Sequence, residues 1–217
     1  MRAPDEKSDK IIVIGSFMGI ALSLFFTAMW IAATVVHGSW NFGLDTLSEL
    51  GGDVPSRCIF NVAAIVSGLL GIPFALALAS HLVPRKLGIL GGYVLAIASI
   101  GLIAVGLFPI DTGRAHTIAS IFFFCAAGIA ALLLLHPLAM RAGFVSAPFI
   151  ATMILIVVSI AFLALTSVPL AEAITVSGLL LWILIMSVWM LHNRKNDSQR
   201  NFVSKREEDK PYAKEED

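Results

Sequence analysis

The sequence predicts an all-α fold, a polytopic membrane bundle of six transmembrane helices with both termini in the cytoplasm. Hydrophobic residues make up 58% of the 217 residues and charged residues only 14%, whereas a soluble globular domain carries about 25% charged residues. Long uncharged runs recur along the chain, and most Lys and Arg residues fall on one predicted side of them. The formal net charge is zero, which argues against a nucleic-acid partner.

Six apolar runs are each close to the length of about 20 residues that crosses the hydrocarbon core of a bilayer. Their backbones must be helical, because lipid offers no hydrogen-bond partners. The first run exceeds the apolar part of a signal peptide, which is about 7–15 residues, so we expect it to remain as a span. The predicted spans cover residues 11–36, 58–83, 87–108, 116–136, 148–168 and 173–191.

The distribution of Lys and Arg predicts which side each segment faces. With six spans, both termini share one side with the loops at Arg85-Lys86 and at Arg141. That side carries 13 of the 15 Lys and Arg residues, and only Arg57 and Arg114 fall on the other. Cytoplasmic loops are enriched in Lys and Arg, so we expect this side to be the cytoplasm. With its six spans, the chain is expected to be a multi-pass protein of the cell membrane. Its parts are a cytoplasmic N-terminus (1–10), a transmembrane domain (11–191) and a disordered, charged cytoplasmic tail (192–217).

The longest predicted external segment, residues 37–57, follows the first span. Loops above about 12–15 residues are usually functional or disordered, and a local helix signal favours order here. Residues 46–49, Thr-Leu-Ser-Glu, have the spacing of a capping box, and the two glycines at 51–52 would end that helix. We expect a short amphipathic helix over the external end of the bundle, with inward-facing Leu44, Leu47 and Leu50.

The predicted hairpin between the third and fourth spans lies on the same side. Pro109 ends the third span, because proline cannot continue the helical hydrogen-bond ladder. Asp111 or Thr112 would cap the fourth span. His116 then falls in the first turns of that span, close to the external headgroups.

Many polar side chains are therefore expected on one side of the membrane. The predicted ligand-binding residues are Ser48, Glu49, Asp53, Arg57, Asn61, Asp111, Arg114 and His116, and Asp45 and Glu172 share their side. One interpretation is an outward-facing pocket for a lipid headgroup or a small ligand. The other is a lid that Arg57 and Arg114 hold to the bundle through ion pairs, with His116 hydrogen-bonded in place.

Catalysis and transport are two further alternatives. A membrane-embedded lipid-modifying enzyme would use His116 as an acid or base, oriented by Glu49 or Asp111, but the sequence favours a binding protein over an enzyme. A transporter needs polar residues that continue to the membrane midplane. The midplane offers mainly Ser23, Ser67, Ser99, Ser159 and Ser177, so transport is the weaker alternative.

Membrane lipids are the expected partners, and neither a metal nor a cofactor is expected. No HxxxH or CxxC spacing brings three or four metal ligands together, and no nucleotide-binding glycine motif occurs. Glycines four residues apart, Gly15 with Gly19 and Gly88 with Gly92, let helices approach closely. We interpret them first as packing within one chain, with a homo-oligomer as the alternative.

Several short segments together resemble one membrane family. They are Ser48-Glu49-Leu50-Gly51, Phe60-Asn61, Gly106-Leu107-Phe108-Pro109 and His116. This set resembles the family named "domain of unknown function 998", which comprises small prokaryotic membrane proteins with six helices. The resemblance covers residues 11–191, leaves out the charged tail, and implies a six-span fold without a particular reaction. The chain is more distantly similar to the Frag/DRAM/Sfk group of six-span proteins, some of which are linked to lipid remodelling.

Overall fold

The computed structural model describes residues 6–82 and 85–208, with side chains for residues 9–82 and 85–194. Within these residues there are helices but no strand. The helices are α1 (Glu6–His37), η1 (Leu47–Gly51), α2 (Arg57–His81), α3 (Lys86–Leu107), η2 (Ile110–Thr112), α4 (Arg114–Ala142), α5 (Ala147–Leu165) and α6 (Val168–Glu208), of which η1 and η2 are short 3-10 helices. Six of them are long and apolar enough to cross a membrane. The predicted all-α fold with six spans is confirmed.

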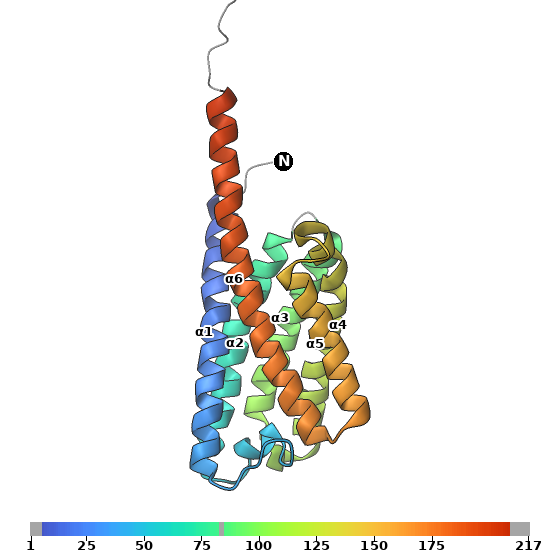
Figure 1. Cartoon of the computed structure of the whole chain (residues 1–217). Coiled ribbons are helices and arrows are strands. Elements are labelled where there is room, and N and C mark those ends of the chain that lie inside the picture. Colours follow the sequence, from blue (N-terminus) through green and yellow to red (C-terminus); the bar gives the residue numbers. More distant parts are fainter. Residues whose placement is uncertain (1–5, 83–84, 209–217) are drawn as a thin grey trace, which may run out of the picture.

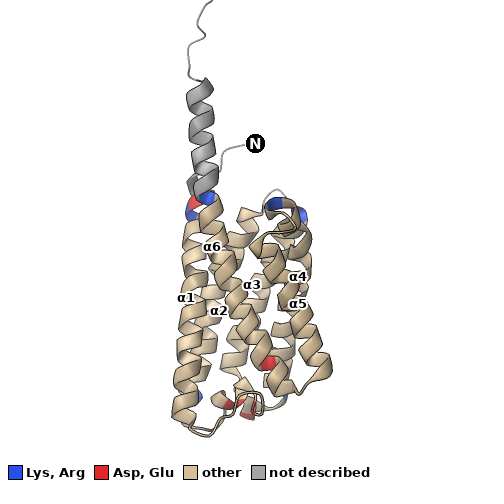
Figure 2. Ribbon diagram, viewed as in Figure 1, with Lys and Arg blue, Asp and Glu red and all other residues tan. Residues whose placement is uncertain are grey.

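The six long helices run up and down beside one another (Figure 1). Helices α1 to α4 each pack against the next in the chain, whereas α6 packs on α1 and on α5. The beginning of α1 and the end of α6 lie at the same end of the bundle, which we call the terminal end. The opposite end, which carries η1, η2 and the turn between α5 and α6, is called the distal end. Charged side chains gather at these two ends (Figure 2).

Glycines set the short distances between neighbouring helices. A Cβ atom at Gly92 of α3 would lie 2.6–2.8 Å from the Cβ, Cα and N atoms of Ala79 in α2. At Gly15 of α1, a Cβ atom would lie 2.5 Å from the carbonyl oxygen of Pro73. These glycines face other helices of the same chain, so the interpretation as packing within one chain is confirmed. Close approach matters in lipid because helix association there depends on van der Waals contact.

Helix α5 packs on α4 and α6, and among the described residues a buried polar contact joins it to α6. The indole Nε1–H of Trp182 in α6 donates to Thr152 Oγ1 at 2.8 Å, and both side chains are buried. Elsewhere α5 presents large apolar side chains outward, among them Ile150, Ile154, Val157, Ile160 and Leu163. Such a surface needs a hydrocarbon environment, which agrees with a membrane span.

The end of α6 differs from the sequence-based expectation. A disordered tail was expected from residue 192, but α6 continues as one helix to Glu208; residues 209–217 lie outside the described residues. Starting a helix is the costly step, whereas extending an existing one adds a hydrogen bond for each residue that is fixed. The membrane span supplies the starting helix, so the polar sequence that follows it can continue as helix.

The close contact at Gly92 predicts a large effect of a small substitution. Gly92→Ala should destabilise the protein by about 1–3 kcal/mol, because the added methyl group meets the backbone of Ala79 and a packed core resists extra volume. A matched control is Gly128→Ala in α4, where nothing lies within 4 Å of the added atom. Alanine favours a helix over glycine by about 1 kcal/mol, so the control should be neutral or stabilising. Thermal unfolding in detergent measures both, and equal behaviour of the two variants would contradict this account of the packing.

Candidate functional site

The segment η1 lies over the distal end with two leucines inserted into the bundle. Leu47 and Leu50 are buried, and they pack with Phe26 and Phe60 in one apolar cluster. Two expectations for this segment are wrong. Leu44 is 76% exposed and does not face inward, and Thr46 makes no side-chain capping bond although its backbone is extended, as at a helix start.

A carboxylate from α6 takes the place of the expected capping box. Glu172 Oε2 accepts the backbone N–H of Leu47 at 3.1 Å, and its Oε1 accepts the hydroxyl of Ser48 at 3.1 Å. An anion that accepts hydrogen bonds from the first residues of a helix satisfies donors that the helix itself leaves free. Residues 125 positions apart in the sequence therefore fix η1 to α6.

The other side of η1 is held by α2. Asn61 Nδ2 donates to the carbonyl oxygen of Gly51 at 2.9 Å, and Ser56 Oγ donates to that of Leu50 at 2.8 Å. A side chain at position 51 would meet Asn61 and Phe60, so the glycine there permits this close approach. Asn61, one of the predicted ligand-binding residues, therefore uses its amide to hold η1.

Three predicted site residues come together beside η1. Arg57 NH1 lies 2.9 Å from Asp111 Oδ2 of η2 and 3.7 Å from Asp53 Oδ1. The Arg57 side chain is 41% exposed and that of Asp111 is 36% exposed, while Asp53 is almost fully exposed. Arg57 therefore joins the two loops of the distal end, as the lid interpretation predicted for this residue, and its guanidinium stays partly exposed.

Arg114 and Glu49 lie apart from these contacts. Both side chains are exposed, and Arg114 takes part in none of the ion pairs between described side chains. The lid interpretation also gave Arg114 an ion pair, and that part is not observed.

The start of α4 is built differently from the prediction. Neither Asp111 nor Thr112 caps it; the capping position is Gly113, whose φ of 60° is a conformation that favours glycine. The Thr112 hydroxyl instead donates to the carbonyl oxygen of Pro109 at 2.7 Å. Asp111 is thereby left to pair with Arg57.

His116 is buried at the hairpin between α3 and α4. Its Nδ1 lies 2.8 Å from the carbonyl oxygen of Phe108, and its Nε2 lies 3.2 Å from Ser120 Oγ. A carbonyl oxygen only accepts, so Nδ1 carries a proton and donates, and the Ser120 hydroxyl can donate to Nε2. Both ring nitrogens are occupied by these contacts. Among the described residues, the structure does not bring His116 into hydrogen-bonding contact with Glu49 or Asp111.

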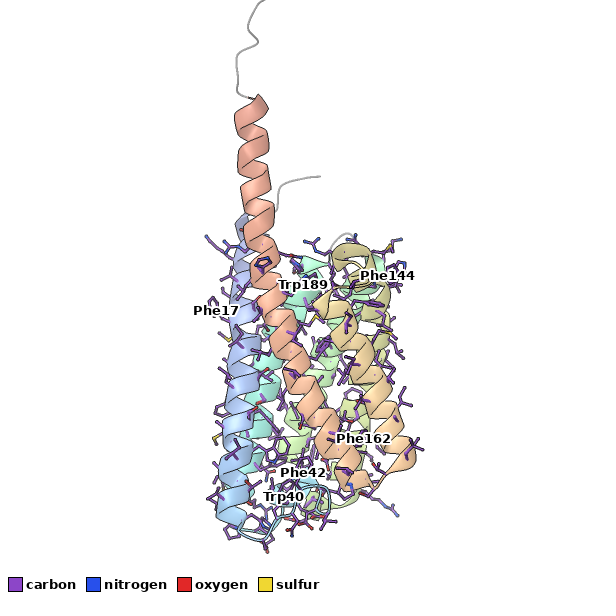
Figure 3. The ribbon with its side chains drawn as sticks, viewed as in Figure 1. Phe17, Trp40, Phe42, Phe144, Phe162 and Trp189 are labelled. Atoms are coloured by element: carbon purple, nitrogen blue, oxygen red, sulfur yellow. The ribbon has the colours of Figure 1, made fainter. Side chains whose placement is uncertain are left out.

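Aromatic side chains surround the loop between α1 and η1. The rings of Trp30, Trp40 and Phe42 lie 6.2–6.4 Å from one another, and Trp40 Nε1–H donates to the carbonyl oxygen of Thr46 at 2.9 Å. Trp40 and Phe42 lie together at the distal end (Figure 3). Phe42 is 54% exposed, so this cluster presents an apolar surface at the same end of the bundle as Arg57 and Asp111.

Sequence reasoning missed a polar cluster at the terminal end. His81 of α2 is buried; Arg141 Nε–H donates to its Nε2 at 3.3 Å, and the ring of Trp189 meets it edge-on at 4.7 Å. Nearby, Arg85 donates to the carbonyl oxygen of Met140 at 3.1 Å. These groups come from α2, α4 and α6 and from the residue before α3, so no local spacing in the sequence identifies them.

The role of Glu172 as the anchor of η1 is open to test. Glu172→Ala leaves the donors of Leu47 and Ser48 without their acceptor, which costs about 1–3 kcal/mol. Local opening of η1 should then become about 5- to 150-fold more frequent, measured as faster hydrogen exchange in residues 44–56. The control is Glu49→Ala, which removes an exposed carboxylate of the same loop. Unchanged exchange in Glu172→Ala would show that the leucines alone hold η1.

Comparison with known proteins places the chain in a family. The family model described as "Protein of unknown function (DUF998)" matches residues 20–191, which span the described helices from α1 to the membrane part of α6. No curated protein and no solved structure matches the chain. The match covers well over half of the sequence, including every distal contact described above, and the chain belongs to the DUF998 family.

Proposed function

We propose that this protein is a multi-pass protein of the cell membrane that binds the headgroup of a zwitterionic phospholipid at its distal end. The observation that carries the proposal is the position of Arg57 between two carboxylates. Its guanidinium lies 2.9 Å from Asp111 and 3.7 Å from Asp53, and it remains 41% exposed. A positive and a negative group are thus offered side by side at the surface.

The chemistry of these groups matches a phosphate linked to an amine. A guanidinium has five N–H donors in a planar arrangement that suits phosphate oxygens. Asp53 is almost fully exposed and can accept the hydrogen bonds of an ammonium group. The second carboxylate, Asp111, keeps Arg57 oriented. Phosphatidylethanolamine carries both complementary groups.

The aromatic cluster supports a position at headgroup level. Tryptophan is enriched at the interface between hydrocarbon and water, and Trp30 and Trp40 lie next to the exposed Phe42. With these side chains at the edge of the hydrocarbon, Arg57 at the start of α2 would lie among the headgroups. A lipid can then reach it by lateral diffusion.

The contacts of His116 favour binding over catalysis. General acid–base chemistry needs a group that can reach the substrate proton. The ring nitrogens of His116 instead join Phe108 to Ser120. Its position gives it a part in holding the hairpin between α3 and α4.

The proposed orientation places the distal end outside the cell. The two terminal segments together with the loops at Arg85-Lys86 and Arg141 hold 13 of the 15 Lys and Arg residues, and such residues are enriched on the cytoplasmic side. The lipid site would then face the outer leaflet.

Lipid binding can be tested with matched arginine variants. Arg57→Gln should lower the retention of phosphatidylethanolamine about 10- to 150-fold, because hydrogen bonds to charged groups contribute about 1.5–3 kcal/mol. Arg114→Gln makes the same charge change at the same end and should retain the lipid. Native mass spectrometry of the protein from vesicles of phosphatidylethanolamine and phosphatidylcholine gives the bound species. Equal retention by the two variants, with both proteins folded, would contradict the proposal.

The orientation predicts opposite labelling of two introduced cysteines. In a background with Cys58→Ser and Cys125→Ser, Asp53→Cys should react with a membrane-impermeant maleimide added to intact cells. Lys86→Cys should react only after the cells are opened. Both native cysteines are free and exposed, so they must be removed first. Labelling of Lys86→Cys from outside would reverse the orientation.

A further inference from the structure

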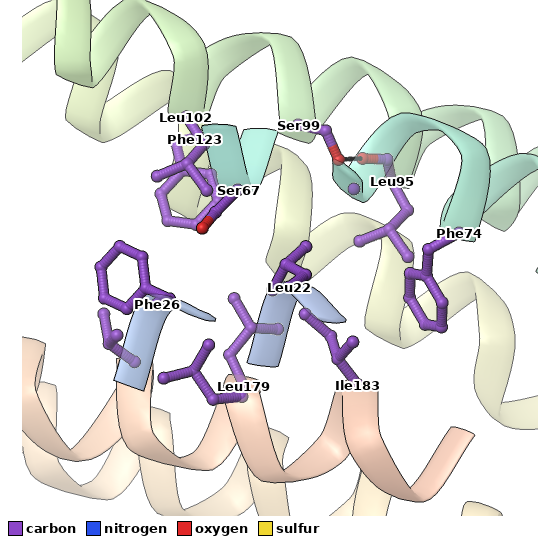
Figure 4. Close-up of a pocket in the computed structure, with 13 residues that line it drawn as sticks. Leu22, Phe26, Ser67, Phe74, Leu95, Ser99, Leu102, Phe123, Leu179 and Ile183 are labelled. Carbon is purple, nitrogen blue, oxygen red and sulfur yellow. Dashed lines mark hydrogen bonds between the residues drawn. The ribbon is translucent and has the colours of Figure 1, made fainter. Parts of the chain in front are cut away.

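A cavity of about 60 Å³ lies inside the bundle, away from the distal end. It is lined from α1, α2, α3, α4 and α6, and its walls include Leu22, Phe26, Phe74, Phe123 and Leu179. Leu179 and Ile183 point from α6 toward Leu22 on α1 (Figure 4). Ser67 is the tenth residue after Arg57 in α2, about 15 Å along the helix axis. The cavity is therefore close to the membrane midplane and separate from the proposed headgroup site.

One polar atom in the cavity wall has no partner. Ser67 is fully buried, and its Oγ makes no hydrogen bond to any described group. The other serines of this region are satisfied: Ser99 Oγ donates to the carbonyl oxygen of Leu95 at 3.0 Å, and Ser23 Oγ donates to that of Leu180 at 3.0 Å. An unpaired buried hydroxyl costs about 1–3 kcal/mol, so a ligand that pairs with it gains that interaction.

Water alone is a poor occupant of this cavity. By volume the cavity has room for about two water molecules, but a buried water typically makes two to four hydrogen bonds. The lining side chains are aliphatic and aromatic apart from Ser67 and Ser99, and the Ser99 hydroxyl already donates to its own helix. The apolar walls can pack against a hydrocarbon ligand, and the Ser67 hydroxyl can donate a hydrogen bond to one oxygen atom of that ligand.

We propose that the cavity binds a hydrocarbon molecule carrying a single hydroxyl or carbonyl oxygen, which accepts a hydrogen bond from Ser67. A cavity of about 60 Å³ holds only a few non-hydrogen atoms, so the oxygen-bearing end of the molecule would lie between Leu22, Phe123 and Leu179. The rest of its hydrocarbon chain would extend toward the bilayer. Leu102 and Leu179 are only half-buried, so the lining reaches the surface between α3 and α6. A ligand dissolved in the bilayer can enter there without crossing the headgroup region.

Photolabelling with two matched probes tests this site. The probes are octanol and octane that each carry a diazirine group, applied to the full-length protein in nanodiscs. Labelled residues are located by mass spectrometry. In the wild type, octanol should label the cavity walls about 2- to 10-fold more than octane, which is the effect of one hydrogen bond of about 0.5–1.5 kcal/mol. Unlabelled octanol should compete.

Three variants separate the hydrogen bond from the space. Ser67→Ala keeps the cavity and should lose the preference for octanol while octane still labels it. Ser67→Leu fills the cavity and should abolish labelling by both probes. Ser99→Ala, whose hydroxyl is bonded to Leu95 in the wild type, should label like the wild type. Size-exclusion chromatography and thermal unfolding identify folded variants, and Ser67→Ala carries the test if Ser67→Leu does not fold.

Two results would overturn the proposal. The first is an absence of wall labelling in the wild type, which would mean that the cavity is empty or holds only water. The second is an equal preference for octanol in the wild type and in Ser67→Ala, which would assign the preference to the bilayer and not to Ser67. The test is independent of the headgroup site, because none of these variants changes Arg57, Asp53 or Asp111.

Discussion

The half-buried carboxylate of Glu172 fixes the arrangement of the distal end. It accepts from Leu47 and Ser48, and this places η1 over the bundle so that Leu50 enters the apolar cluster. The residues after η1 then lead into α2 with Arg57 directed toward η2. Carboxylates are expensive to bury unless they are hydrogen-bonded, and the two donors of η1 supply those bonds. Glu172 therefore holds η1 in place, and η1 in turn supplies the hydrogen bonds that the Glu172 carboxylate needs.

Most of the fold follows from the sequence because the bilayer leaves few choices. Long apolar runs must be helical in lipid, so the six spans and their order were predictable, and Pro109 marked the end of α3 near Phe108. The end of α6 was not predictable from composition alone. A polar segment is disordered by itself, but helix continues through it here because the membrane span has already formed the first turns.

The candidate site was predictable in composition but not in its contacts. The predicted spans put Asp53, Arg57 and Asp111 on one side of the membrane, and the structure brings these three side chains together. The pairing of Ser48 with Glu172 depends on how α6 crosses the bundle, which no local pattern encodes. The capping-box spacing was misleading for this reason: the Glu49 N–H, which the Thr46 hydroxyl would have accepted, donates to the Thr46 carbonyl oxygen, and the Leu47 N–H donates to Glu172 on another helix.

The length of α6 has a mechanical consequence. The ion pair between Arg194 and Asp9, 3.0 Å apart, joins α6 to α1 where the two helices leave the bundle. The helix then runs a further 14 residues to Glu208, about 21 Å at 1.5 Å per residue. The segment and the membrane span form one continuous helix. The same helix lines the central cavity through Leu179 and Ile183, so a change in the tilt of α6 at the cavity would displace Glu208 farther than Arg194.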